Sequence, residues 1–182
     1  MLSIALLHHP VYNKDGQIVT TAVVNNDIHD IARMAKTFGI YRFYLVTPLE
    51  KQKEYAAKII RHWVDGFGGV YNPSRREAFL LCSIKGSLAE CLQDFSASPF
   101  VLATSAHPPE EGTLISNSSV KAMLQTGERE VLLLVGTGWG LSKEVLQQAD
   151  AILEPIRGLG AYNHLSVRCA SAIIVSRITG EY

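Results

Sequence analysis

The chain has 182 residues, with 17 Lys and Arg against 17 Asp and Glu, and 47% of its residues are hydrophobic. This composition excludes a disordered chain. A chain of this length buries roughly 70% of the surface that it exposes when unfolded, so we expect one domain over residues 1–182. The formal net charge of zero excludes attraction of nucleic acid by a global positive field, so such a partner would need a local basic patch.

Targeting and redox signals are weak along the whole sequence. The longest apolar runs are far shorter than the roughly 20 residues that cross a bilayer, so we expect no membrane span. The first apolar stretch is stopped by His8-His9-Pro10 and lacks the basic region of a secretory signal. The three cysteines are far apart, which predicts neither disulfides nor a metal site and favours a reducing cytoplasm. They are Cys82, Cys91 and Cys169.

Short apolar or β-branched runs alternate with longer amphipathic stretches, a pattern typical of βαβ units. The predicted strands are Leu2–Leu7, Phe43–Val46, Leu80–Ile84, Phe100–Thr104, Val131–Val135 and Ala151–Leu153. The predicted helices are Asp27–Phe38, Glu50–Val64, Leu88–Phe95, Ser118–Gln125, Lys143–Ala149 and His164–Ile178. We therefore predict an α/β fold with a mainly parallel six-stranded sheet and helices on both faces. Segments 11–24 and 105–115 resist assignment, and we expect functional loops there.

The first and last predicted helices have distinctive faces. The first has Asp27 as its expected N-cap, apolar residues at three- and four-residue spacing, and Gly39 just past its end. Its polar face carries Asp30 and Arg33. The last helix is mostly apolar on every side over residues 165–175, so the sheet alone cannot cover it. A second copy of the chain is the expected cover.

A glycine-rich turn follows the predicted strand Val131–Val135. It reads Gly136-Thr137-Gly138-Trp139-Gly140, and Ser142 then begins a helix. Glycines let the backbone approach a ligand closely and expose its amide N–H groups. The turn is therefore a candidate cofactor-binding loop, and a tight turn without a ligand is the plain alternative.

A nicotinamide-dependent oxidoreductase is a second interpretation of the same turn. Glu154, about 20 residues further on, would supply the acidic ribose ligand of a dinucleotide site. The position of the turn disfavours this interpretation, because a dinucleotide turn follows the first strand of its fold and needs several further βα units. Fewer than thirty residues follow Glu154, and the third glycine of the motif falls on Leu141.

Two more loops are expected beside the glycine turn. One carries Thr104 and Ser105 after a predicted strand, and the other runs over residues 154–167 with Asn163 as candidate N-cap of the last helix. Ligands of open α/β sheets bind outside the carboxyl ends of the strands. The three loops therefore predict one pocket.

The three loops and the apolar last helix resemble the cofactor-binding half of the SPOUT superfamily of S-adenosylmethionine (AdoMet)-dependent RNA methyltransferases. The N-terminal half agrees, because Asn25–Arg33 and Phe43–Pro48 are similar to motifs of a stand-alone branch of these enzymes. The resemblance covers essentially the whole chain. It implies a C-terminal deep trefoil knot, AdoMet bound in that knot, a homodimer through the knot region and last helix, and a tRNA or rRNA substrate.

The resemblance also implies roles for individual residues. The implied cofactor-binding residues are Thr104, Ser105, Gly136, Thr137, Gly138, Gly140, Ile156, Gly158, Asn163 and Leu165. The catalytic candidates are Arg33, as anchor of a phosphate or ribose, with Asp30 and His164. A plainer interpretation keeps Arg33 and Asp30 as a surface ion pair at helical spacing.

Three departures from the ribose 2′-O-methylating branch, one of them a glycine turn that is a residue shorter, leave the acceptor open between a base nitrogen and the 2′-hydroxyl. Asp27 stands where that branch has Asn, and His164 lies where its third loop has a different order of residues. A non-catalytic RNA-binding module that retained the knot is a further alternative. Basic residues that would meet RNA gather in the first half of the chain. They are Arg33, Lys36, Arg42, Lys51, Lys53, Lys58, Arg61, Arg75 and Arg76.

Overall fold

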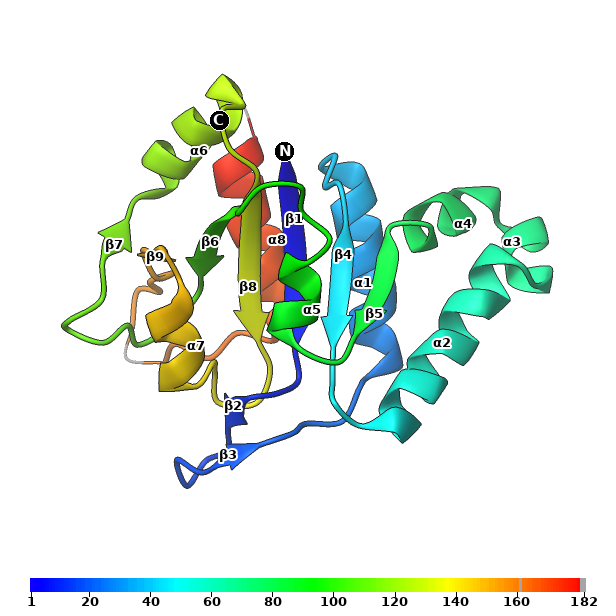
Figure 1. Cartoon of the computed structure of the whole chain (residues 1–182), viewed down its shortest axis with the longest axis horizontal. Helices are drawn as coiled ribbons and strands as arrows, with labels where there is room; N and C mark the ends of the chain where they lie inside the picture. The colour runs from blue at the N-terminus through cyan, green and yellow to red at the C-terminus, as the bar shows by residue number, and fades with distance from the viewer. Residues whose placement is uncertain (161, 181–182) are drawn as a thin grey trace.

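The computed structural model describes residues 1–160 and 162–180 (Figure 1). Within these residues, seven parallel strands form one sheet in the order β5-β4-β1-β8-β6-β9-β7. The strands are β1 (Leu2–Leu7), β4 (Phe43–Val46), β5 (Cys82–Lys85), β6 (Phe100–Ala103), β7 (Leu114–Ile115), β8 (Val131–Gly136) and β9 (Ala151–Leu153). The predicted parallel sheet is confirmed. The predicted count of six strands is wrong for the described chain, because β7 pairs with β9 at the edge.

Helices cover both faces of the sheet, as the sequence predicts (Figure 1). They are α1 (Asn25–Thr37), α2 (Glu50–Val64), α3 (Phe67–Tyr71), α4 (Pro73–Phe79), α5 (Leu88–Leu92), α6 (Asn117–Thr126), α7 (Lys143–Gln148) and α8 (Val167–Thr179). Helices α5 and α7 pack on one face, and α1, α6 and α8 pack on the other. The sheet is therefore the middle of three layers.

Strand residues alternate between two hydrophobic cores. In β8, Leu133 and Val135 join the core under α1 and α8, whereas Leu132 and Leu134 join the core under α5 and α7. Because both faces are covered, the central strands read as continuous apolar runs instead of alternating ones.

The strand order brings the carboxyl ends of β1, β8 and β6 together. From β1 the chain moves outward through β4 to β5, crosses to β6, and then returns along β8, which lies between β1 and β6. All these strands are parallel, so their carboxyl ends lie at one edge of the sheet. The point where the strand order reverses is where open α/β sheets form ligand crevices.

The segment between α2 and β5 contains two helices that were not predicted. Asn72 caps α4, accepting a hydrogen bond from the backbone N–H of Arg75 at 3.0 Å, and Pro73 occupies its first turn. This cap and proline are a helix-start signal in the sequence. Leu80, the predicted start of a strand, is instead the C-cap residue of α4. Strand β5 begins at Cys82.

Two helix starts differ from their predictions. Asp27 is not the N-cap of α1; Val24 holds that position without a side-chain cap, and Asp27 lies in the first turn. The last helix starts at Val167, because the Ser166 hydroxyl accepts a hydrogen bond from the Cys169 N–H at 3.3 Å. Asn163 and His164 therefore remain in the preceding loop. The predicted start of α7 at Ser142 is confirmed.

The unassigned segment 11–24 holds a two-stranded antiparallel hairpin, β2 (Val11–Tyr12) and β3 (Ile18–Val19). Tyr12 is bonded to the glycine turn in both directions: its N–H donates to Gly140 O at 2.9 Å, and its carbonyl accepts from the Trp139 N–H at 2.9 Å. The hairpin thus supports the turn that follows β8.

The apolar last helix is partly covered within the chain. It packs against α6, α1 and β8, which bury Ile174, Val175 and Ile178. Cys169 on the same helix is exposed. Among the described residues, no helix has the length and apolar character needed to span a membrane.

Candidate functional site

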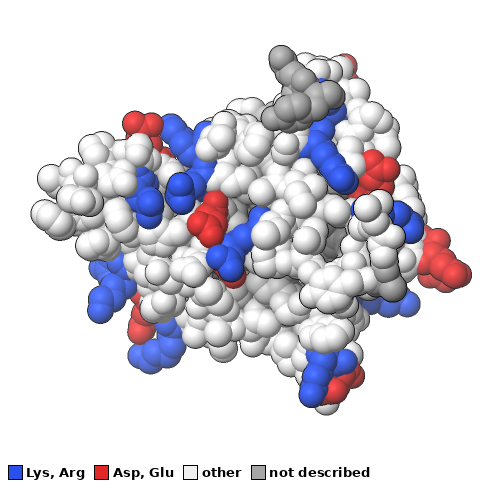
Figure 2. Space-filling model, turned by 180° about the vertical axis from the view of Figure 1, so that it is seen from behind, with Lys and Arg blue, Asp and Glu red and all other residues white. Residues whose placement is uncertain are grey.

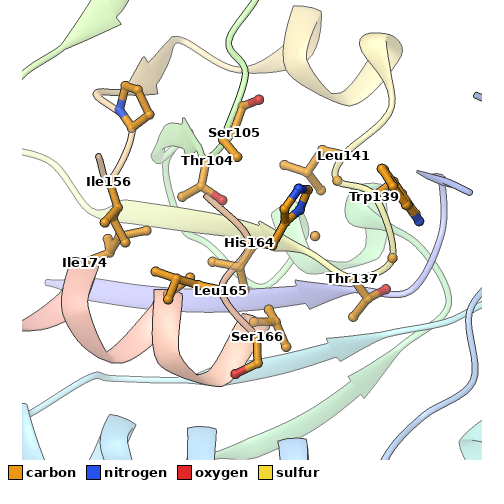
Figure 3. A pocket seen from close by; sticks show the side chains of 18 of the residues that line it. Thr104, Ser105, Thr137, Trp139, Leu141, Ile156, His164, Leu165, Ser166 and Ile174 are labelled. Carbon is orange, nitrogen blue, oxygen red and sulfur yellow. The ribbon is translucent and has the colours of Figure 1, made fainter. Parts of the chain in front are cut away.

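A pocket of about 900 Å³ lies at the carboxyl edge of the sheet. Its wall is formed by the loops after β6, β8 and β9, the start of α8, and the segment between β1 and α1. Figure 3 shows side chains from these segments around one shared space. This volume is typical of small-molecule sites, which measure about 300–1,000 Å³. The three loops therefore do meet in one pocket.

The glycine turn needs glycine for two structural reasons. A Cβ atom on Gly136 would lie 2.8 Å from the Leu141 nitrogen, and one on Gly138 would lie 2.8 Å from the Tyr12 carbonyl oxygen. Gly138 also has a φ of +60°, a conformation that L-residues with side chains rarely adopt. Close backbone packing therefore shapes this wall of the pocket and leaves the turn's surface free of side-chain bulk at these positions.

Hydroxyl groups tie the turn to the first strand. The Thr137 hydroxyl donates to Leu7 O at 3.1 Å and is also paired with the Thr21 hydroxyl. Thr21 in turn is bonded to Nδ1 of His8 at 2.9 Å. His8 is fully buried, and burial lowers its pKa to about 4. A neutral His8 therefore supports the pocket from behind instead of lining it.

Side chains from several segments are distributed along the length of the pocket. In Figure 3, Ile156 and Ile174 lie at one end, Thr137 and Trp139 lie at the other, and His164 is between them. The loop after β9 is closed on itself at the apolar end, since the Asn163 side-chain amide donates to Ile156 O at 3.1 Å. The isoleucine side chains at this end offer an apolar surface for a flat ring.

A cluster of charges joins α1 to α8 beside the pocket. Nε of Arg168 lies 3.0 Å from Oδ1 of Asp27, and its Nη1 donates to Oδ2 of Asp30 at 3.1 Å. Asp27 is buried, and both Asp27 and Arg168 line the pocket. Burial raises the pKa of the Asp27 carboxyl; the Arg168 guanidinium opposes this shift and the Asp30 carboxylate adds to it. The pocket thus holds a carboxyl group made more basic by its surroundings.

The structure brings most of the predicted site residues together. The predicted residues that line the pocket are Thr104, Ser105, Gly136, Thr137, Gly138, Gly140, Ile156, Asn163, Leu165 and His164. Gly158 and Arg33 are exposed and lie outside the set of lining residues. The Arg33 side chain is 60% exposed, and its Nη1 lies 3.9 Å from Oδ1 of Asp30. Asp30 likewise lies outside the lining set. The surface ion-pair interpretation therefore describes the geometry of Arg33 and Asp30.

Sequence reasoning missed several lining residues: Tyr12, Thr21, Asp27, Trp139 and Arg168. Tyr12 and Thr21 belong to the unassigned segment that was expected to be functional. Asp27 carried a signal, because it replaces Asn in the first motif. No local signal marks Arg168, whose partners are on the first helix.

Glu154 does not have the role that the nicotinamide interpretation requires. Its Oε1 accepts a hydrogen bond from the Asn117 N–H at 2.8 Å and another from the Asn117 side-chain amide. The carboxylate therefore caps the start of α6. Glu154 lines the pocket, but this contact commits one of its carboxylate oxygens to α6 and so weakens the case for a dinucleotide site.

Comparison with known proteins identifies the family. Residues 1–180 match a family described as SAM-dependent RNA methyltransferase, SAM being AdoMet. The chain belongs to this family. A tRNA (guanine-N(1)-)-methyltransferase from Oleidesulfovibrio alaskensis is 43% identical over 181 residues, covering 97% of this chain and 41% of that protein. The chain thus spans about two fifths of the length of the curated relatives it matches.

Solved structures share the fold. TrmJ from Z. mobilis matches with a TM-score of 0.67 and 16% identity, covering 100% of this chain and 70% of that one. The SpoU methyltransferase AviRb from Streptomyces viridochromogenes, solved in complex with the cofactor AdoMet, matches with a TM-score of 0.61 and 15% identity, covering 97% of this chain and 56% of that one. These likenesses show a shared fold, and the predicted RNA methyltransferase family is confirmed by the family match over residues 1–180.

Proposed function

We propose that residues 1–182 form one domain that transfers a methyl group from AdoMet to tRNA or rRNA. The observation that carries this proposal is the pocket at the carboxyl edge of the sheet, built on a glycine turn in a chain of this family. Most of the tRNA methyltransferase relative lies outside the match, so its named activity does not choose the acceptor. Both a base nitrogen and a ribose 2′-hydroxyl stay open.

The residues of the pocket suit AdoMet. The turn at Gly136, Gly138 and Gly140 offers backbone groups without side-chain bulk, as the close approaches of Leu141 and Tyr12 require. Ile156 and Leu165 would pack against the adenine ring. Thr104, Ser105, Thr137 and Asn163 would contact its polar parts. Gly158, on the exposed part of the third loop, would contact AdoMet through its backbone. When bound, AdoMet supplies a methyl group on a positively charged sulfur, which is open to attack by a nucleophile.

Methyl transfer to a hydroxyl oxygen, or to a base nitrogen that carries a hydrogen, requires that the acceptor lose a proton. We place Asp27 in this role, because its buried carboxylate lines the pocket and burial raises its pKa. Arg168, 3.0 Å away, would hold the carboxylate in place. His164 also lines the pocket and is the second candidate for the proton. Arg33, with Asp30 orienting it, is kept as the anchor of an RNA phosphate outside the pocket.

A homodimer and a trefoil knot complete the proposal. Large apolar side chains stay exposed near the start of α8; Trp139 on the glycine turn is 64% exposed, and Tyr162 and Leu165 are exposed as well. A second copy packed here would cover them. The support for the trefoil knot is the resemblance of the three loops and the last helix to the SPOUT superfamily. An RNA substrate and three free thiols favour a cytoplasmic enzyme.

Calorimetric titration of the purified chain with AdoMet and, separately, with NAD⁺ tests the pocket. We expect saturable heat with AdoMet and with its demethylated product, and none with NAD⁺. Binding of NAD⁺ without binding of AdoMet would reinstate the oxidoreductase interpretation.

Sedimentation of the same sample tests the dimer, because a monomer at micromolar concentration would contradict it.

A further inference from the structure

Helices α2, α3 and α4 form a projection at the β5 edge of the sheet, at the right of Figure 1. Its tip is α3, which packs against α2 and α4. Three large apolar side chains of α3 face solvent: Phe67 is 72% exposed, Val70 is 78% exposed and Tyr71 is 78% exposed. The rings of Phe67 and Tyr71 stack with their centroids 6.1 Å apart and an angle of 25° between them. Exposed apolar groups gathered in this way mark a binding surface.

Two basic side chains, unpaired within the described part of the chain, lie on the helix next to this aromatic tip. Lys58 and Arg61 lie on the exposed side of α2, and neither pairs with a carboxylate among the described residues. By contrast, Lys51 and Lys36 of the predicted basic set are neutralised by Glu54 and Glu77. Figure 2 shows the projection at the left, with an uncharged tip and mostly blue, some red, side chains behind it. The free cations therefore lie on α2, the helix that packs against the aromatic tip.

The exposed side of α2 connects this tip to the side of the molecule that carries the pocket. Gln52 in the first turn of α2 accepts a hydrogen bond from the Val23 N–H at 2.6 Å, and the adjacent Val24 lines the pocket. From there, Tyr55, Lys58 and Arg61 follow at helical spacing toward α3, and all three are exposed. An extended ligand that reached the pocket would meet this side of α2 on its way to the tip.

This combination of groups fits unpaired RNA. Proteins bind single strands by stacking bases on aromatic rings and by placing Lys and Arg along the backbone phosphates. A purely apolar partner would leave Lys58 and Arg61 desolvated without anions, which is costly. Phosphates complement both charges, and the ring faces at the tip accept bases of any sequence.

We propose that the α2–α4 projection binds an unpaired segment of the RNA substrate, with bases on Phe67 and Tyr71 and phosphates along Lys58 and Arg61. This inference rests on the proposed function for its ligand. The surface would hold the RNA so that a nucleotide further along the strand enters the pocket.

Fluorescence anisotropy with a short labelled single-stranded RNA of mixed sequence tests the surface without requiring catalysis. The double variant Phe67→Ala/Tyr71→Ala is expected to bind this RNA about tenfold more weakly, because stacking contributes at this scale. A second variant, Lys58→Gln/Arg61→Gln, is expected to lower the slope of log affinity against log salt by about 1.4, since each single-strand phosphate contact contributes about 0.7. Both variants should bind AdoMet as the parent chain does.

The matched control is Leu114→Ala/Lys121→Gln, which removes an exposed apolar side chain and a cation near the opposite edge of the sheet; its RNA affinity should not change. Unchanged RNA affinity in both test variants would overturn the proposal. So would a change in oligomeric state of Phe67→Ala/Tyr71→Ala, because the tip would then be a subunit contact. Failure of the parent chain to methylate RNA would overturn the proposed function. The anisotropy measurements would still show whether the projection binds RNA.

Discussion

The Nε atom of Arg168 lies 3.0 Å from Oδ1 of Asp27, which joins the last helix of the chain to the first turn of α1. The same guanidinium donates to Asp30 through Nη1. One cation therefore sits between two carboxylates, and the more buried of these carboxylates lines the pocket. This arrangement places the proposed proton acceptor where the substrate and cofactor segments of the chain meet.

Replacing Asp27 by Asn should remove the proton acceptor and keep the shape of the site. We expect kcat for methyl transfer to fall by about a hundredfold or more, because general bases contribute at that scale. AdoMet affinity should stay within about twofold of the parent value. Single-turnover assays with labelled AdoMet give both quantities. Glu128→Gln is the control, since Glu128 is exposed and lies outside the pocket lining; an equal loss in the control would move the role away from Asp27.

Replacing Arg168 by Met should change the pH dependence of the reaction. The guanidinium lowers the pKa of Asp27 against the effect of burial, so its removal raises that pKa. The carboxylate then becomes protonated at a higher pH, and the acidic limb of the rate profile should move toward higher pH. Measurement of kcat against pH for Arg168→Met and Arg168→Lys tests this, because the Lys variant keeps a positive charge. Superimposable profiles for the parent and both variants would contradict the assignment.

Replacing Gly138 by Ala should damage the cofactor loop. The new Cβ would lie 2.8 Å from the Tyr12 carbonyl oxygen, and φ is +60°. We expect a loss of about 1–3 kcal/mol in the free energy of unfolding, together with weaker AdoMet binding. Gly160→Ala is the control, because nothing lies within 4 Å of its added Cβ and its φ is not positive. Thermal unfolding with and without AdoMet separates the two effects, and equal behaviour of the two variants would contradict the account of the turn.

His8 should make the chain less stable at mildly acidic pH. Burial lowers its pKa from 6.5 to about 4. Between these two pH values, His8 is protonated in the unfolded chain and neutral in the folded chain. The stabilisation is complete above the unfolded pKa and is lost as the pH falls toward the folded value. Its size is roughly 3 kcal/mol. Urea unfolding at several pH values measures it, and NMR titration of the His8 ring checks the cause; a ring that titrates near pH 6.5 in the folded chain would contradict it.

Much of the fold follows from the sequence pattern. The apolar runs at β1, β4 and β9 are bounded in the structure as predicted, because buried parallel strands need continuous apolar residues and are followed by turn signals. The short β7 and the helix α3 were missed. The first has only two residues and is defined by its pairing with β9, and the second depends on packing against α2 and α4.

The sequence predicts the part of the site that is formed by the backbone of loops. Glycine spacing and loop positions predict the turn at Gly136–Gly140 and its place beside Thr104 and Ser105, and the structure puts them in one pocket. The charges were not predictable in the same way. Arg168 meets Asp27 and Asp30 through tertiary contact between the first and last helices, and no spacing in the sequence encodes that contact.

The most direct test of the central claim is transfer of label from methyl-tritiated AdoMet to total tRNA and rRNA by the purified chain. The account predicts incorporation into RNA that depends on time and on protein concentration, and that falls by about a hundredfold in Asp27→Asn. A preparation that binds AdoMet yet labels neither RNA pool would contradict the claim and favour a non-catalytic RNA-binding module.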